Sequence, residues 1–515
     1  MQKYIPKLFF LLFFIAGLFV VQDYGCSWDE DQQMKHGKVS AKEICKQLNL
    51  DCPKLERDKN LPALQDYEQK YYGTFFQLVA IGIDTVLVRE RFGEKILTRH
   101  YLGFLLFFIG VICFYRLLFT RFEGLLSLLG VIIYATLPRI FAHSFFNPKD
   151  TIFLSFFVIS LYALSRFLNS RDHKNVLFMA FSSALMLNAR ILGLVLFLAV
   201  IASLILYKKT IKRNLKWTLL YIGETFLCLV VIWPLLWENT FTNLLDTFTL
   251  FSKYPWEGEL LYWGNYISSS EIPWHYIPSW ILITTPLFFL MLMLLGIALM
   301  VFQILKNYKL WFESYTVTLD GIVLGVTLGP LIAIIIFDSV VYGGWRHLFF
   351  IHAGLVYALI FCVKFLQSKY PKLKRPLLLS LGIAIIWNVV QLVRLHPQQH
   401  LYFNPLITES LQEFEQDYWG VSTKLGMEKL MEIIPQDKSS SVFAYDFPAW
   451  CNFKILNPKA EKLEFVWEQE KGDYFIDNFR RKEHIDAFLN KTGLYSDPVY
   501  VIYSQGSPVV GIFKL

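Results

Sequence analysis

Charged residues are scarce in this chain: Asp, Glu, Lys and Arg make up 18% of its 515 residues, against about 25% in an average soluble domain. Hydrophobic residues take their place, at 55% of the chain, and the mean hydropathy is +0.42. Such a composition excludes an ordinary soluble enzyme. We therefore interpret the chain as an integral membrane protein.

The sequence also lacks common nucleotide-site and metal-site motifs. It has no GxxxxGK[ST] phosphate loop, no HExxH and no paired CxxC, so nothing supports a reaction driven by nucleotide hydrolysis. The net charge is +7 at pH 7, but Lys and Arg stand in short clusters between apolar runs, as in cytoplasmic loops. No basic stripe of the kind that binds nucleic acid is present, so we predict no nucleic-acid partner.

Cysteine is sparse, with seven residues in two groups. Three lie inside apolar runs, where free cysteine usually acts as a packing residue: Cys113, Cys228 and Cys362. Four lie outside them: Cys26, Cys45, Cys52 and Cys451. If the loop after the first run faces an oxidising compartment, Cys45 and Cys52 are candidates for a disulfide, although the odd total leaves the pairing open.

Eleven apolar runs are long enough, or nearly so, to span a bilayer. They cover 4–21, 96–119, 122–137, 152–167, 176–187, 191–206, 217–233, 277–305, 322–337, 348–365 and 377–393. No small-x-small cleavage site follows the first run, which favours an uncleaved helix over a signal peptide. We predict an α-helical polytopic domain over 1–393, with a long outer segment at 22–95.

The distribution of Lys and Arg predicts the orientation. Five cations lie in each of 208–216 and 364–375, whereas the alternate loops hold only a few, among them Lys253. Loops rich in Lys and Arg stay inside, so the N-terminus is predicted inside and residues 394–515 outside. This last part has strand-like runs at 441–444 and 499–503 and helix-like runs at 423–434 and 481–489, which predicts a small α/β domain.

Three consecutive acids, Asp29, Glu30 and Asp31, follow the first apolar run. They are either solvated charges at the membrane surface or a functional site. Adjacent carboxylates at that surface can act as a general base or hold a divalent cation, and we leave a metal requirement open. Tyr71 and Tyr72 begin an amphipathic stretch, 71–88, that we expect to lie in the membrane interface and include among the substrate-binding candidates.

A second candidate region is the polar outer loop 138–150. Lys149 and Arg139 suit a phosphate group, and His143 and Asn147 are candidate substrate ligands. Asp150 is either the N-cap of the next span or a site acid, and one side chain can fill both roles.

The third region, 338–352, contains Tyr342, Arg346 and His347 beside two glycines. Arg346 either snorkels to the membrane surface or binds a phosphate, and Arg190 poses the same choice. The outer stretch 234–278 is rich in Trp and Tyr, which form an interfacial belt or else stack on a sugar or line a lipid path.

Several short motifs resemble those of the GT-C glycosyltransferases related to protein mannosyltransferases and to bacterial aminoarabinose lipid A transferases. The resemblance rests on Asp29-Glu30, the Pro138…Asn147-Pro148-Lys149-Asp150 loop, Pro273-Trp274-His275-Tyr276 with Thr284-Thr285-Pro286, Arg346, His396-Pro397…Tyr402-Phe403-Asn404-Pro405, and Asp417-Tyr418-Trp419-Gly420.

This resemblance implies transfer of a sugar from a polyprenyl-phosphate carrier to an acceptor on the outer face, with inversion at the anomeric carbon. It implies a bacterial inner membrane and a site that faces the periplasm. Asp29 matches the first-loop acid of such enzymes, with Glu30 beside it, and Asp150 matches the second acid. The third consecutive acid leaves the choice between Asp29 and Glu30 open.

The sequence leaves two rival functions open. A transporter would place ionisable residues within its spans, and Glu224 is one such residue. A non-enzymatic scaffold would bind partners through residues 394–515.

Overall fold

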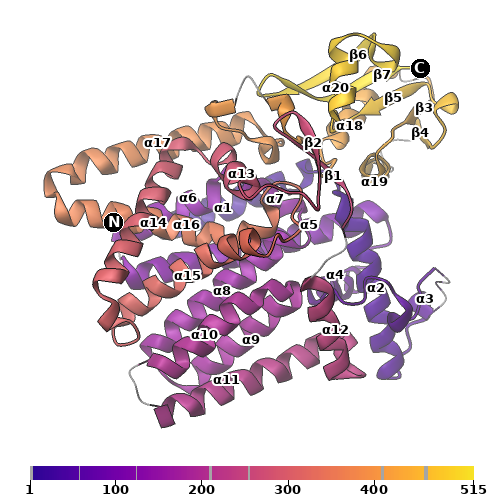
Figure 1. The fold of residues 1–515 in the computed structure, drawn as a ribbon. Coiled ribbons are helices and arrows are strands. Elements are labelled where there is room, and N and C mark those ends of the chain that lie inside the picture. The colour runs from indigo at the N-terminus through magenta and orange to yellow at the C-terminus, as the bar shows by residue number, and fades with distance from the viewer. Residues whose placement is uncertain are drawn as a thin grey trace.

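The computed structural model describes residues 4–56, 58, 60–122, 124–207, 211–252, 256–407, 411–435, 437–456 and 462–515. Long helices form the body of the molecule, and a small sheet lies at one end of it (Figure 1). The predicted class, a helical membrane protein with a C-terminal α/β part, is confirmed. Lys208, Lys209 and Lys253, which entered the orientation prediction, lie outside the described residues.

Eight helices of the described chain are long and apolar enough to cross a membrane. They include α1 (Ile5–Val20), α5 (Phe92–Arg121), α8 (Asp150–Asn169), α11 (Ile211–Ile232), α14 (Leu287–Lys306), α15 (Tyr315–Ile336), α16 (His352–Lys369) and α17 (Lys374–Arg394). A ninth span is a pair, α6 (Gly124–Thr136) and α7 (Pro138–Phe146), bent by 60°. Pro138 causes the bend, because the residue before a proline is forced into an extended conformation, as Leu137 is.

The predicted number of eleven spans is therefore higher than the eight or nine found. The predicted fifth and sixth spans correspond to α9 (His173–Ala189) and α10 (Leu194–Leu206), which have 17 and 13 residues. The predicted run 277–305 is two helices, α13 (Tyr276–Thr284) and α14, because Pro286 forces Thr285 into an extended conformation.

Two helices form the centre of the body. The span of α8 is 94% buried, and the span made of η7 (Arg346–Ile351) and α16 is 89% buried, whereas that of α17 is 11% buried. Helices that are apolar on all sides are expected in such central positions. Asp150 is the first residue of α8 and Arg346 the first of η7, so both charged side chains lie at the ends of buried helices.

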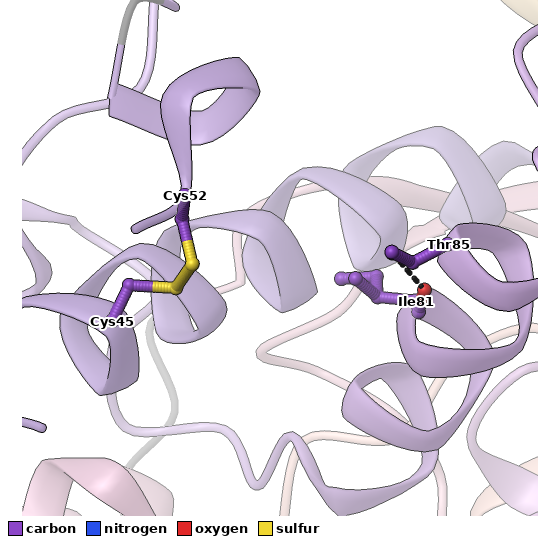
Figure 2. Close-up of a disulfide and its surroundings, with 4 residues drawn as sticks. All are labelled: Cys45, Cys52, Ile81 and Thr85. Atoms are coloured by element: carbon purple, nitrogen blue, oxygen red, sulfur yellow. Dashed lines mark hydrogen bonds between the residues drawn. A yellow bond between two sulfur atoms is a disulfide. The ribbon is translucent and has the colours of Figure 1, made fainter. Parts of the chain in front are cut away.

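The segment after α1 folds into α2 (Trp28–Gln47), α3 (Pro53–Glu56) and α4 (Phe75–Val86). A disulfide joins Cys45 near the end of α2 to Cys52 just before α3 (Figure 2). The nearby helix α4 lies within the amphipathic stretch predicted from the sequence. In this helix the Thr85 hydroxyl donates to the Ile81 carbonyl at 2.8 Å. The disulfide anchors the C-terminal end of α2.

The stretch after α11 contains η5 (Pro234–Trp237), α12 (Thr240–Ser252) and a hairpin of β1 (Glu259–Tyr262) and β2 (Asn265–Ser268). Trp263 and Gly264 form its two-residue turn with φ of 50° and 75°, the conformation that tight hairpins require. The Tyr266 hydroxyl donates to Glu483 at 2.7 Å, so the hairpin contacts the C-terminal part.

The C-terminal part is a five-stranded mixed sheet in the order β4-β3-β5-β7-β6. Its elements are α18 (Thr423–Ile433), β3 (Ser440–Phe443), α19 (Phe447–Leu456), β4 (Leu463–Val466), β5 (Tyr474–Asp477), α20 (Lys482–Leu489), β6 (Pro498–Ser504) and β7 (Ser507–Lys514). Residues of α18, α19 and the inner strands form a core separate from that of the helical body. The four secondary-structure runs predicted in this part are found within a residue or two.

Candidate active site

The first turn of α2 gives its acids different surroundings. Ser27 precedes the helix, and Glu30 closes a capping box with it, an arrangement that satisfies backbone N–H groups at a helix start. The Glu30 carboxylate accepts from the Ser27 N–H at 2.8 Å, and its other oxygen lies 2.8 Å from His100 Nε2. Glu30 is 1% exposed, so both of its oxygens are used by the fold.

Asp29 points into a group of cations instead. Its Oδ2 lies 3.5 Å from Arg346 Nη1 and 3.7 Å from Lys149 Nζ, and its side chain keeps 22% of its exposure. Burial raises the pKa of Asp29, but Lys149, Arg346 and Arg190 outweigh burial, so the pKa is lowered below its ordinary value. Asp29 is therefore an ionised and accessible carboxylate.

Asp150 lies beside Asp29 across the same arginine. Its Oδ2 is 3.9 Å from Arg346 Nη1, and its Oδ1 forms an ion pair with Arg190 at the end of α9. The Asn147 amide donates to Asp150 Oδ2 at 2.9 Å and accepts from the Asp150 N–H at 2.8 Å. Lys149 occupies the N-cap position, so the interpretation of Asp150 as the N-cap is wrong and Asn147 caps the helix start in its place.

The cluster has more positive than negative charge. Two carboxylates, Asp29 and Asp150, lie among Lys149, Arg190 and Arg346. Arg190 Nε and Arg346 Nε are buried and donate no hydrogen bond within the described part of the chain. Buried donors without acceptors are costly, and an anion such as a phosphate would satisfy them. Burial, together with the neighbouring arginines, lowers the pKa of Lys149 despite Asp29.

Aromatic rings hold Arg346 in place. Its guanidinium carbon lies 4.5 Å from the Tyr342 ring centroid, 5.0 Å from that of Tyr418 and 4.7 Å from that of Trp419. Nη2 donates to the Tyr418 hydroxyl at 3.4 Å, and the side chain is 3% exposed. The snorkelling interpretation of Arg346 is therefore wrong: the arginine is fixed inside the protein by cation–π contacts.

A cavity of about 230 Å³ lies next to the cluster. Five residues predicted as site residues line it: Tyr71, Tyr72, Arg190, Tyr342 and His347. The remaining lining is largely apolar and includes Leu187, Ile191, Leu192, Trp233, Phe251 and Val341. Lys149 lies 4.3 Å from the centroid of the Tyr72 ring, which links the cavity to the charged cluster.

Two predicted residues lie apart from the two carboxylates. Arg139 donates to the Tyr402 carbonyl at 2.9 Å and lies 4.6 Å from the Phe403 ring centroid. It therefore holds the chain that follows α17. His143 is buried, with Nδ1 3.2 Å from the Asn147 amide, so it acts on Asp150 only through Asn147.

Sequence reasoning missed several aromatic residues of the site. Tyr418 and Trp419 were noted as a motif but not as ligands of Arg346. Trp256 stacks on Tyr342 with centroids 4.0 Å apart, which places it beside the cluster. No pattern in the sequence places residues 256 and 418 beside 342, although the density of Trp and Tyr in 234–278 was a signal.

The residues present do not suit a divalent cation. Each carboxylate that points into the cluster already faces cationic side chains. Among the described residues no group of three or more His, Cys, Asp and Glu side chains has metal-binding geometry. A cation would meet the field of Lys149, Arg190 and Arg346, so the site suits an anion better.

Residues 87–237 match the family described as dolichyl-phosphate-mannose-protein mannosyltransferase. The resemblance inferred from the sequence is confirmed over this stretch. It contains six of the predicted site residues: Arg139, His143, Asn147, Lys149, Asp150 and Arg190. The matched family consists, by its description, of glycosyltransferases.

Solved structures are also similar to the chain. The apo oligosaccharyltransferase of Archaeoglobus fulgidus has a TM-score of 0.49 at 10% identity, over 95% of this chain and 71% of that one. Apo ArnT of Cupriavidus metallidurans has a TM-score of 0.46 at 10% identity, over 98% of each chain. ArnT bound to undecaprenyl phosphate has a TM-score of 0.45 at 11% identity, over 98% of this chain and 97% of ArnT. No curated protein matches the sequence.

Proposed function

We propose that this chain is an inverting glycosyltransferase that moves a hexose or pentose from a polyprenyl-phosphate carrier to a lipid, glycan or protein acceptor. The reaction takes place on the outer face of a bacterial inner membrane. One observation carries the proposal: Asp29 and Asp150 share Arg346, while Lys149 and Arg190 leave the cluster with excess positive charge and unused N–H donors.

In the proposed mechanism Asp29 is the base. Its carboxylate accepts the proton of the acceptor nucleophile, which attacks the anomeric carbon as the bond to the carrier phosphate breaks. Arg346, Lys149 and Arg190 neutralise the charge that develops on the leaving phosphate. Asp150 is a positioning residue, because it holds Arg190 and faces Arg346 without exposing its own oxygens.

Donor binding would also strengthen the base. The pKa of Asp29 is lowered by the same cations that would bind the phosphate. A phosphate placed among them brings negative charge and so raises the pKa of Asp29 back toward its ordinary value. The base would thus gain proton affinity only when the donor is present, which suppresses proton uptake in the empty enzyme.

The cavity beside the cluster supports a lipid-linked donor. Its lining combines apolar side chains with Tyr71, Tyr72, Tyr342 and Arg190. Apolar surface suits the first isoprene units of a carrier, and aromatic rings suit a sugar. A small soluble phosphate would need no such lining.

The direct test compares neighbouring acids in the purified protein. Asp29→Asn should lower transfer from a polyprenyl-phosphate-linked sugar by about 10²- to 10⁴-fold. Asp31→Asn, the same change two residues on, should stay within about twofold, because Asp31 faces Lys35 and Lys38 rather than the cluster. Equal activities of the two variants would refute Asp29 as the base.

Glu224, the residue that would favour a transporter, lies outside the cavity. It pairs with His173 at 2.7 Å, and the cavity is lined by other residues. Sugar transfer by the protein in detergent, without a sealed compartment, distinguishes an enzyme from a transporter.

A further inference from the structure

We propose that Cys26 and Cys451 form a second disulfide, which ties the start of α2 to α19. This bond is independent of the proposed function. It assigns two cysteines that sequence analysis left without a partner.

The backbones around the two cysteines are held together. Cys26, Ile96 and Cys451 form one buried cluster, with both cysteines 0% exposed. Asn452 accepts from the Cys26 N–H at 2.6 Å and donates to the Cys26 carbonyl at 3.2 Å. A Cβ atom at Gly25 would lie 2.5 Å from Asn452 Oδ1, so the approach of the two segments requires a glycine there.

The two thiols interact directly. Burial, followed by a side-chain contact with Cys451, raises the pKa of Cys26 well above its ordinary value. The other contact of the Cys26 thiol is a weak one, donation to the Ser27 carbonyl at 3.6 Å. Two buried thiols in contact thus make only weak hydrogen bonds in the reduced state. A disulfide would join the same two side chains covalently.

Both cysteines are on the side of the membrane where a disulfide forms. Residues 24–56 are all described and contain no helix that qualifies as a span. Cys26 therefore lies in the same compartment as the Cys45–Cys52 disulfide. The hydrogen bonds of Asn452 place Cys451 there too. An environment that oxidises one pair of thiols is able to oxidise the other.

The bond forms by thiol–disulfide exchange with a disulfide oxidoreductase of that compartment. The Cys26 thiolate attacks the oxidant's disulfide while the segment is still accessible, which gives a mixed disulfide and releases one thiolate. When α19 docks, the Cys451 thiolate attacks Cys26 Sγ and expels the second. Two thiols are oxidised, and the two thiolates of the oxidant take up the protons that Cys26 and Cys451 lose, so the oxidant becomes a dithiol.

The test counts free thiols in the full-length protein, purified without reductant, denatured and labelled with a maleimide. We expect three reactive thiols, on Cys113, Cys228 and Cys362, and seven after reduction. Five before reduction would overturn the proposal. Tryptic digestion should also yield peptide 8–35 linked to peptide 439–454, with peptides 43–46 and 47–54 linked as the internal control.

A single substitution sharpens the count, because the two hypotheses predict opposite changes. Cys451→Ser should raise the number of free thiols from three to four, since it releases Cys26. Without the bond the same substitution lowers the number from five to four. Cys362→Ser is the matched control and should lower the number by one in either case. If Cys451→Ser fails to accumulate, Cys26→Ser gives the same prediction through release of Cys451.

Discussion

Two buried charge clusters lie at opposite ends of α8, and they differ in how completely their groups are paired. Arg121 binds both oxygens of Asp320, at 2.9 and 2.8 Å, and the Tyr357 hydroxyl donates to the same carboxylate at 2.5 Å. The Thr120 hydroxyl lies 3.2 Å from that of Ser165, which places this cluster near the C-terminal end of α8. The cluster around Asp150, at the other end, keeps excess cations and unused donors.

The difference is the one expected between a structural ion pair and the binding site that we propose around Asp150. One acid and one base with a bidentate geometry leave nothing for a ligand to satisfy. Three cations around two acids leave about one positive charge, in a place where unpaired charge is expensive. Proteins retain an uncompensated buried charge of this kind mainly at sites where function requires it.

Among changes to the cations of the cluster, the largest effect is expected from removing the arginine that both acids face. Arg346→Ala should lower sugar transfer by about 10²-fold or more, since the leaving phosphate loses its central donor. Arg346→Lys should recover only part of the activity, because an ammonium cannot make the planar stack against Tyr342 and Trp419. Initial rates with a lipid-linked sugar check both variants.

A change in the paired cluster should have the opposite signature. Asp320→Asn leaves Arg121 without its counter-charge and should destabilise the protein by about 3 kcal/mol. The kcat of the folded fraction should not change, because this cluster lies at the far end of α8. Thermal unfolding in detergent measures the first effect and transfer per folded protein the second. A large loss of kcat in Asp320→Asn with an unchanged Tm would contradict the distinction between the clusters.

Local patterns explain what was predictable from the sequence. The helices and strands of the C-terminal part depend on apolar periodicity over a few residues, and α18, β3 and α20 were found close to their predicted positions. The number of spans was less predictable, since α10 is apolar but has 13 residues, and α9 has 17. The length of such a helix depends on where the next turn begins, and tertiary packing determines the position of that turn.

The proposal of Asp29 rather than Glu30 as the base rests on the structure. Ser27-Trp28-Asp29-Glu30 fits a capping box, a pattern readable in the sequence that assigns the glutamate to the helix start. The partner of Glu30 is His100, and two of the aromatic partners of Arg346 are Tyr418 and Trp419; all three come from distant parts of the chain. No local rule brings Tyr418 to Arg346, so the aromatic clamp had to be observed.

A smaller effect, on pH dependence, tests the electrostatics of the cluster most directly. Lys149 is the largest cationic contribution that lowers the pKa of Asp29, so Lys149→Met should raise that pKa. A base is active only when ionised, and its activity is lost as the pH falls through its pKa. The acid limb of the rate profile should therefore move to higher pH in Lys149→Met, while the rate near neutral pH falls only through weaker donor binding. Lys35→Met, which alters an exposed lysine of the same surface, should leave the profile in place. Coincident acid limbs in wild type and Lys149→Met would show that Asp29 does not titrate as the base, because a carboxylate in contact with that ammonium must respond to its removal.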